Sequence, residues 1–148
     1  MTRTTFATRE DHEQAVSKWH VVDASEHVMG RMASRIAEVL MGKHRPDYTP
    51  HISVGEGVIV INASRTGVTG QKRETRTYFK WTGFVGGKSR TSLGERLDND
   101  SEKLIKDAVR RMLPKNRIGR SMLKRLKVYA GADHPHQAQT PTKLEIPS

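Results

Sequence analysis

The glycine-rich segment Gly83–Ser89 (GFVGGKS) is the part of this sequence that comes nearest to a nucleotide-binding motif. A phosphate-binding loop has the pattern G-x-x-x-x-G-K-[ST] between a strand and a helix. Residues 87–89 supply the end of this pattern, but its first glycine would fall at position 82, which is Thr82. No apolar run follows that could begin a helix. The segment therefore favours a flexible loop whose Lys88 and Arg90 contact a phosphate backbone, with a nucleotide-hydrolysing enzyme as the less favoured alternative.

Two histidines, His134 and His136, flank a proline near the C-terminus and are the nearest approach to a metal-binding pattern. The chain has no cysteine, and no convincing carboxylate partner stands near them. Beside a basic region, such histidines are expected to stack on bases or bond to phosphates. Asp23, which follows a predicted strand, is expected to cap the next turn rather than to act in catalysis. No nucleophile motif is present, so we expect no enzyme, no small-molecule substrate, no metal and no cofactor.

The charge of the chain is strongly positive and unevenly distributed. Lys and Arg number 26 against 16 Asp and Glu, which gives a net charge of +10. The window 103–127 holds ten of these cations and one acid, Asp107, and the window 65–90 holds seven cations and one acid, Glu74. The acidic stretch 95–102 separates the two windows. Such clustering indicates a surface for a polyanion, and nucleic acid is favoured over a membrane because few aromatic residues could anchor one.

RNA contacts are expected from most of the basic side chains of these windows, from the residues after a first predicted helix, and from the two tail histidines. Charge and position in the chain are the grounds for this choice. The residues are Lys43, His44, Arg45, Lys72, Arg73, Lys80, Lys88, Arg90, Arg110, Arg111, Lys115, Arg117, Arg120, Lys124, Arg125, Lys127, His134 and His136.

Hydrophobic periodicity predicts the helices that must position these charges. At 29–41 six apolar residues fall on one helical face, and Gly42 follows as a C-cap. A second apolar stripe at 101–113 begins after Ser101, a suitable N-cap, and ends at Pro114.

A basic corner is predicted at 112–120 (MLPKNRIGR), where Pro114 ends one helix and a shorter basic helix follows at 117–125. Proline and glycine fix the angle between two cationic elements. The result is a shaped, charged surface suited to folded RNA, whose backbone shape is its main recognisable feature.

Strands are predicted at 19–24, 57–62, 75–81 and 126–130. The run 57–62 contains four successive β-branched residues, which is typical of a strand covered on both faces in a parallel sheet. Within 75–81, Phe79 and Trp81 share one face. We expect this pair to point inward, and a base-stacking platform is the open alternative. Strands that alternate with helices indicate an α/β domain with a mainly parallel sheet.

The length of 148 residues suits one domain. We expect a loose N-terminal extension at 1–17, one α/β domain at 18–130 and an extended tail at 131–148. No stretch approaches the roughly 20 apolar residues of a membrane span, and residues 1–18 lack the apolar centre of a secretory signal. The lack of cysteine fits a reducing compartment, so we expect a soluble cytoplasmic protein without a membrane partner.

Taken together, many segments resemble the bacterial large-subunit ribosomal protein family L-thirteen (universal uL-thirteen). The N-terminal pieces are WHVVDA (19–24) with Gly30-Arg31, GKHR (42–45), YTPH (48–51) and VIVINA (58–63). The central pieces are VTGQK (68–72), Tyr78, and Thr82-Gly83 through Gly86-Gly87. The C-terminal pieces are MLPKNRIGR (112–120), LKVYAG (126–131) and HPHQAQTP (134–141).

This resemblance implies a three-layer α/β/α fold with a four-stranded, mainly parallel sheet. It also implies binding to large-subunit ribosomal RNA, a part in early subunit assembly, and contacts with neighbouring large-subunit ribosomal proteins. Two places differ from the family pattern: Arg111, where glycine is usual, and the segment 94–101. A free regulator that binds messenger RNA outside the ribosome stays open as an alternative.

Overall fold

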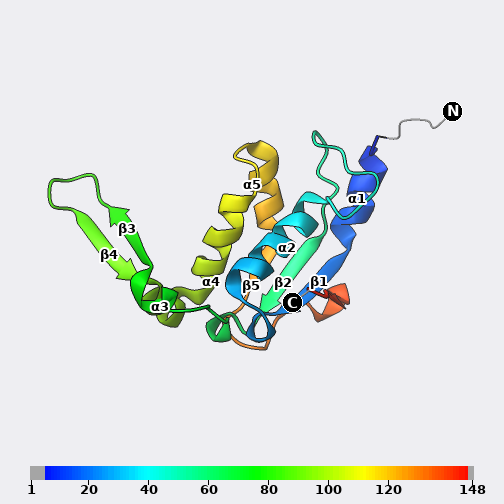
Figure 1. Cartoon of the computed structure of the whole chain (residues 1–148). Helices are drawn as coiled ribbons and strands as arrows, with labels where there is room; N and C mark the ends of the chain where they lie inside the picture. Colours follow the sequence, from blue (N-terminus) through cyan, green and yellow to red (C-terminus); the bar gives the residue numbers. More distant parts are fainter. Residues whose placement is uncertain (1–5, 147–148) are drawn as a thin grey trace.

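A computed structural model gives the structure of residues 6–146. Its centre is a parallel sheet of four strands in the order β5-β2-β1-β6 (Figure 1). The strands are β1 Trp19–Asp23, β2 Gly57–Ile61, β5 Leu126–Val128 and β6 Thr142–Lys143. The predicted α/β class with a four-stranded parallel sheet is confirmed.

Strand β2 lies inside the sheet because its residues are apolar on both sides. Val58, Ile59 and Val60 are fully buried. Val60 is paired with Val22 of β1 on one side and with Val128 of β5 on the other. The run of β-branched residues predicts this burial on both faces, and the prediction is confirmed.

Three helices cover one face of the sheet. They are α2 Met29–Met41, α4 Leu93–Met112 and α5 Arg117–Lys124. Apolar residues of all three join Val22, Val58 and Val60 in one buried cluster. Helix α2 has its predicted bounds, and Gly42 ends it with a φ of 82°, a left-handed conformation that glycine adopts without steric cost. Short 3-10 helices follow β1 and β2, namely η1 Ala24–Glu26 and η2 Ala63–Arg65.

The C-terminal segment packs against the opposite face and one edge of the sheet. His136 stacks on Trp19 with ring centroids 5.8 Å apart, and its Nε2 lies 2.7 Å from the Tyr129 hydroxyl. After η3 (Gln137–Gln139), β6 pairs with β1. The sequence predicts only an extended tail here. The sequence does not predict strand β6, because Thr142–Lys143 is too short to show a strand pattern of its own.

Helix α1 (Arg9–Ser17) is a correction to the loose N-terminal segment that the sequence predicts. The N–H of Thr8 donates to Asp11 Oδ2 at 2.7 Å, and the N–H of Asp11 donates to Thr8 Oγ1 at 3.4 Å. This reciprocal capping satisfies the first donors of the helix, and Ala15 is buried against the body. Residues 1–5 of the predicted extension lie outside the described residues.

The segment 72–92 forms a two-stranded antiparallel ribbon outside the central sheet. A short helix α3 (Lys72–Thr75) precedes β3 (Thr77–Trp81), which pairs with β4 (Lys88–Ser92). Figure 1 shows the ribbon projecting from the body. The sequence predicts a strand at 75–81 but none at β4, because β4 contains no apolar residue.

The two faces of the ribbon are the reverse of the prediction. Phe79 and Trp81 are expected inside but are 55% and 71% exposed. Tyr78, on the other face, packs on a small apolar cluster that includes Met29 and Leu93. Because the ribbon projects, only its Tyr78 side reaches an apolar partner in the body.

Helix α4 begins earlier than the sequence predicts. Its first residue is Leu93 rather than a residue after Ser101. The N–H of Glu95 donates to Ser92 Oγ at 3.2 Å, and the N–H of Ser92 donates to Glu95 Oε2 at 3.0 Å. Asp100 has φ −135° and ψ 46°, which interrupts the helical conformation. The apolar stripe restarts after this kink, so sequence periodicity finds only the second half of the helix.

Candidate RNA-binding surface

The turn between α4 and α5 forms the predicted basic corner. Leu113 is buried, and its N–H donates to Val109 O at 3.1 Å at the end of α4. Asn116 caps α5 by accepting from the Gly119 N–H at 2.8 Å. A Cβ at position 119 would lie 1.9 Å from Pro114 O, so only glycine lets α5 approach the turn this closely. The backbone itself therefore fixes the angle of the corner.

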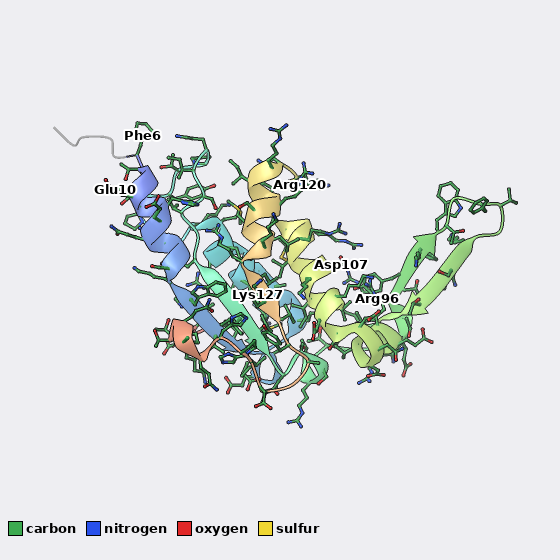
Figure 2. All side chains as sticks on the ribbon, turned by 180° about the vertical axis from the view of Figure 1, so that it is seen from behind. Phe6, Glu10, Arg96, Asp107, Arg120 and Lys127 are labelled. Atoms are coloured by element: carbon green, nitrogen blue, oxygen red, sulfur yellow. The ribbon has the colours of Figure 1, made fainter. Side chains whose placement is uncertain are left out.

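The cations of the corner point to solvent. The exposed side chains are Arg110, Arg111, Lys115, Arg117, Arg120 and Lys124, and Figure 2 labels Arg120 on α5. The one acid of this window, Asp107, accepts from Arg96 at 3.0 Å and lies 3.4 Å from Arg110. Among the described residues, the remaining corner cations form no ion pair. Their charge is thus available to a partner.

An open groove of about 760 Å³ lies between the ribbon and α4. Arg76 and Lys80 line it from the ribbon side, and Lys103, Arg110 and Arg111 line it from α4. The two basic windows, which an acidic stretch separates in the sequence, therefore face each other across one groove. Figure 2 shows the same arrangement, with α4 and the ribbon as two arms.

Three of the cations that line this groove contact the ring of Tyr78. The guanidinium carbons of Arg96, Arg76 and Arg111 lie 4.6, 5.7 and 6.0 Å from the centroid of its ring. Each contact of this kind contributes roughly 0.5–1 kcal/mol at a partly exposed site. The ring holds the three charges near one another, against their mutual repulsion.

The acidic stretch 95–102 has local roles in the structure. Glu95 caps α4, and Asp98 accepts from Arg73 at 2.7 Å. Arg73 therefore forms an ion pair with a carboxylate, and its charge is less available to a partner. Glu95 and Asp100 also line the groove, so the groove is predominantly but not uniformly cationic.

The predicted residues that follow α2 belong to a different cluster, centred on the buried Glu56. A carboxylate oxygen of Glu56 lies 2.5 Å from His20 Nε2 and 3.3 Å from His44 Nε2. Burial alone would raise the pKa of Glu56, but the hydrogen bond from His20 and the nearby charge of His44 outweigh it, so this pKa lies below its ordinary value. Lys43 is exposed beside this cluster.

Arg45 is tied to two carboxylates in the same region. Its Nε and Nη2 donate to Asp47 at 3.0 and 2.9 Å, and its Nη1 lies 3.9 Å from Glu56. The hydrogen bonds from Arg45 hold the pKa of Asp47 below its ordinary value. The Arg45 side chain is only 18% exposed.

Arg125 serves internal packing. Its guanidinium donates to Gly55 O at 2.7 Å, to Leu40 O at 3.4 Å and to the Ser53 hydroxyl. Burial lowers the pKa of Arg125. These bonds join the end of α5 to the segment before β2. Lys127, two residues on, is half-buried within β5.

His134 and His136 lie on the face of the sheet opposite to α4. The His136 ring stacks on Trp19, and the backbone N–H of His136 donates to His134 Nδ1 at 3.2 Å. Within the described residues, these two histidines attach the tail to the sheet. The structure therefore places them away from the groove.

The groove includes three cations that the sequence-based site omits: Arg76, Arg96 and Lys103. Arg76 and Lys103 stand in the basic windows, and charge alone could have included them. Arg96 stands within the acidic stretch and carries no such signal. Its place depends on packing against Tyr78 and on the ion pair with Asp107.

The glycine-rich loop lacks the context of a nucleotide site. It joins the antiparallel strands β3 and β4, and strand β4 begins at Lys88, where a phosphate-binding loop would be followed by a helix.

Asp23 caps η1 as predicted, accepting from the Ser25 N–H at 2.9 Å. Within residues 6–146, no group of three or more His, Asp or Glu side chains is placed to hold a metal ion. Nor does any helix in this range have the length and apolar character needed to cross a membrane.

Comparison with known proteins identifies the family. The family model described as ribosomal protein L13 matches residues 17–135. A protein of Thermotoga petrophila named large ribosomal subunit protein uL13 is 52% identical over 134 residues, which cover 90% of each chain. The protein of the same name from Saccharopolyspora erythraea is 48% identical over 128 residues, 86% of each chain. The resemblance found in the sequence is confirmed, and the chain belongs to the ribosomal protein L13 family.

Proposed function

We propose that this protein is a structural constituent of the large ribosomal subunit, that it binds large-subunit ribosomal RNA, and that it supports early subunit assembly in the cytoplasm. The family relationship supports the ribosomal role. The observation that carries RNA binding is the exposed basic corner together with the groove that shares Arg110 and Arg111 with it, across which cations from two separate windows of the sequence face each other.

Charge neutralisation supplies the affinity in this proposal. Each Lys or Arg that contacts a phosphate releases condensed counterions, and the logarithm of the binding constant falls with the logarithm of salt concentration by roughly 0.7–0.9 per contact. The groove presents cations along α4, and the corner presents exposed cations at the C-terminal end of this helix.

Shape supplies the selectivity. The corner is fixed by the close approach of Gly119 to Pro114 O, and Tyr78 holds three guanidiniums near one ring. A fixed array of charges fits a folded RNA whose phosphates match it and fits other RNA poorly. Neighbouring large-subunit proteins are the second class of partner in this proposal. No feature of the described residues favours messenger RNA.

The test replaces Arg117, Arg120 and Lys124 together by Ala in the full chain. All three side chains are exposed, and none has an ion-pair partner among the described residues, so the fold is expected to persist. Tagged wild-type and variant chains are expressed in cells, and cell extracts are sedimented through sucrose gradients. The variant is expected to be depleted from large subunits and to accumulate near the top of the gradient.

A charge-matched control replaces three exposed cations outside the corner and groove, namely Lys18, Arg31 and Lys143, of which Lys143 pairs with Glu26 at 3.3 Å on the surface. This control has the same loss of net charge and is expected to sediment with large subunits like the wild type. Equal incorporation of both variants would contradict the corner as a binding site. Absence of the wild-type chain from ribosomes would overturn the ribosomal role itself.

A further inference from the structure

One face of the ribbon carries aromatic and cationic side chains side by side. The register pairs Phe79 with Arg90 and Trp81 with Lys88. Directly opposed residues of an antiparallel pair point to the same face, so these four side chains share one surface. We call this surface the outer face of the ribbon. Tyr78 is on the other face, which looks toward the body.

The cations of the outer face lie close to its rings. Lys88 Nζ lies 4.4 Å from the centroid of the Phe79 ring, and the guanidinium carbon of Arg90 lies 5.1 Å from it. Neither cation forms an ion pair with any described carboxylate. The outer face therefore combines flat apolar groups with positive charge that no acid of the described chain neutralises.

The exposure of this surface indicates a partner. Trp81 is 71% exposed, and Phe84 and Val85 in the adjoining loop are also exposed. Large apolar side chains gathered on a projecting element are costly in water unless another molecule covers them. The charge on the same surface decides the chemistry of that molecule, because a polyanion satisfies Lys88 and Arg90 whereas an apolar protein surface would desolvate them.

We propose that the outer face binds unpaired nucleotides of RNA. Bases stack on Trp81 and Phe79, and the flanking phosphates contact Lys88 and Arg90. Stacking on aromatic rings needs a base outside a duplex, and it tolerates any base because each has a π face. This inference rests on the proposed function. It adds a second mode of RNA binding beside that of the groove, whose cations contact the phosphates of folded RNA.

Fluorescence of Trp81 tests the proposal directly. The chain has two tryptophans, and Trp19→Phe leaves Trp81 as the sole one while keeping an aromatic ring against His136. This full-length variant is titrated with a short single-stranded uridine oligonucleotide and with an RNA duplex of equal length. Stacking predicts saturable quenching of the Trp81 emission by the single strand and little change with the duplex.

Affinity measurements separate stacking from charge. Trp81→Ala and Phe79→Ala are each expected to weaken single-strand binding by about tenfold without changing the salt slope. Lys88→Ala is expected to reduce the salt slope by about 0.7. Phe6→Ala is the matched control, because Phe6 is 64% exposed but lies far from the ribbon in the sequence and at the opposite end of the molecule in Figure 2. It is expected to bind as the wild type does.

The outcomes are distinguishable from those of the proposed function. If Trp81→Ala binds the single strand as tightly as the wild type, or if saturation leaves the Trp81 emission unchanged, stacking is refuted and the outer face is left as a protein-binding surface. In that case the wild type can still enter large subunits, and the proposed function stands. If the wild-type chain binds neither RNA nor ribosomes, both proposals fail.

Discussion

The Nε2 atom of His20 lies 2.5 Å from a carboxylate oxygen of Glu56, and this contact joins β1 to the residue that immediately precedes β2. The other ring nitrogen of His20 lies 3.0 Å from the hydroxyl of Thr142 in β6. The Glu56 carboxylate is also close to His44 and Arg45. One buried acid thus connects two strands of the sheet and the loop that follows α2.

Glu56→Gln is expected to lower the free energy of unfolding at pH 7 by about 2 kcal/mol, because it removes the charge that three basic side chains surround. The pKa of Glu56 is lowered in the folded protein. Its stabilising contribution is therefore complete above the ordinary glutamate pKa of roughly 4.3 and is lost as the pH falls through the folded value. Urea unfolding at pH 7 and at about pH 3 measures this loss. Between the two pH values the variant, which has no carboxylate at position 56, should lose less free energy of unfolding than the wild type.

Glu38→Gln controls for the loss of a carboxylate. Glu38 pairs with Arg35 at 2.8 Å on the exposed side of α2, where an ion pair contributes roughly 0.5 kcal/mol or less. Similar destabilisation by the two substitutions would contradict the special role of the buried acid.

Gly119→Ala is expected to destabilise the protein by about 1–3 kcal/mol and to open the corner. The new methyl group would lie 1.9 Å from Pro114 O. The energetic cost of relieving this overlap exceeds the gain of roughly 1 kcal/mol in helix propensity from Gly to Ala. Gly30→Ala in α2 makes the same change where nothing lies within 4 Å, so it should be neutral or stabilising. Thermal unfolding of both variants distinguishes steric overlap from propensity, and a stable Gly119→Ala variant would refute the close approach.

The groove predicts a measurable salt dependence of RNA binding. Lys103→Ala and Arg111→Ala are each expected to reduce the slope of the logarithm of the binding constant against the logarithm of salt concentration by roughly 0.7–0.9. Filter binding of a large-subunit RNA fragment over a range of salt concentrations measures the slope. Lys143→Ala removes an exposed cation outside the groove and should leave the salt slope unchanged. A slope that falls equally in all three variants would indicate diffuse attraction instead of a defined groove.

Two adjacent cations provide a test of structural against binding roles. Arg125→Met is expected to destabilise the fold by about 3 kcal/mol, because the Gly55 and Leu40 carbonyls and the Ser53 hydroxyl lose a charged donor. Lys124→Met should leave the urea midpoint almost unchanged but reduce the salt slope of RNA binding, since Lys124 is exposed on α5. If Arg125→Met reduced only the salt slope and Lys124→Met lowered the urea midpoint, Arg125 would have the binding role and Lys124 the structural role.

Sequence alone determined the elements whose signals are local. The apolar stripe and Gly42 define α2, the β-branched run defines β2, and the proline after Leu113 defines the corner. These features depend on neighbours within a few residues, whose spacing the sequence displays directly. The dense positive charge likewise indicates a polyanionic partner, because net charge depends on composition and not on the fold.

Tertiary structure alone decided which charges meet. Arg96 and Arg111 come together at Tyr78, whereas Arg125 turns inward toward Gly55, 70 positions away. The outward position of Phe79 also depends on the ribbon projecting from the body, which no alternation pattern reveals. Each of these outcomes depends on partners distant in the chain. Side-chain type states what a residue can bind, but the packing of the whole chain determines which partner comes within reach.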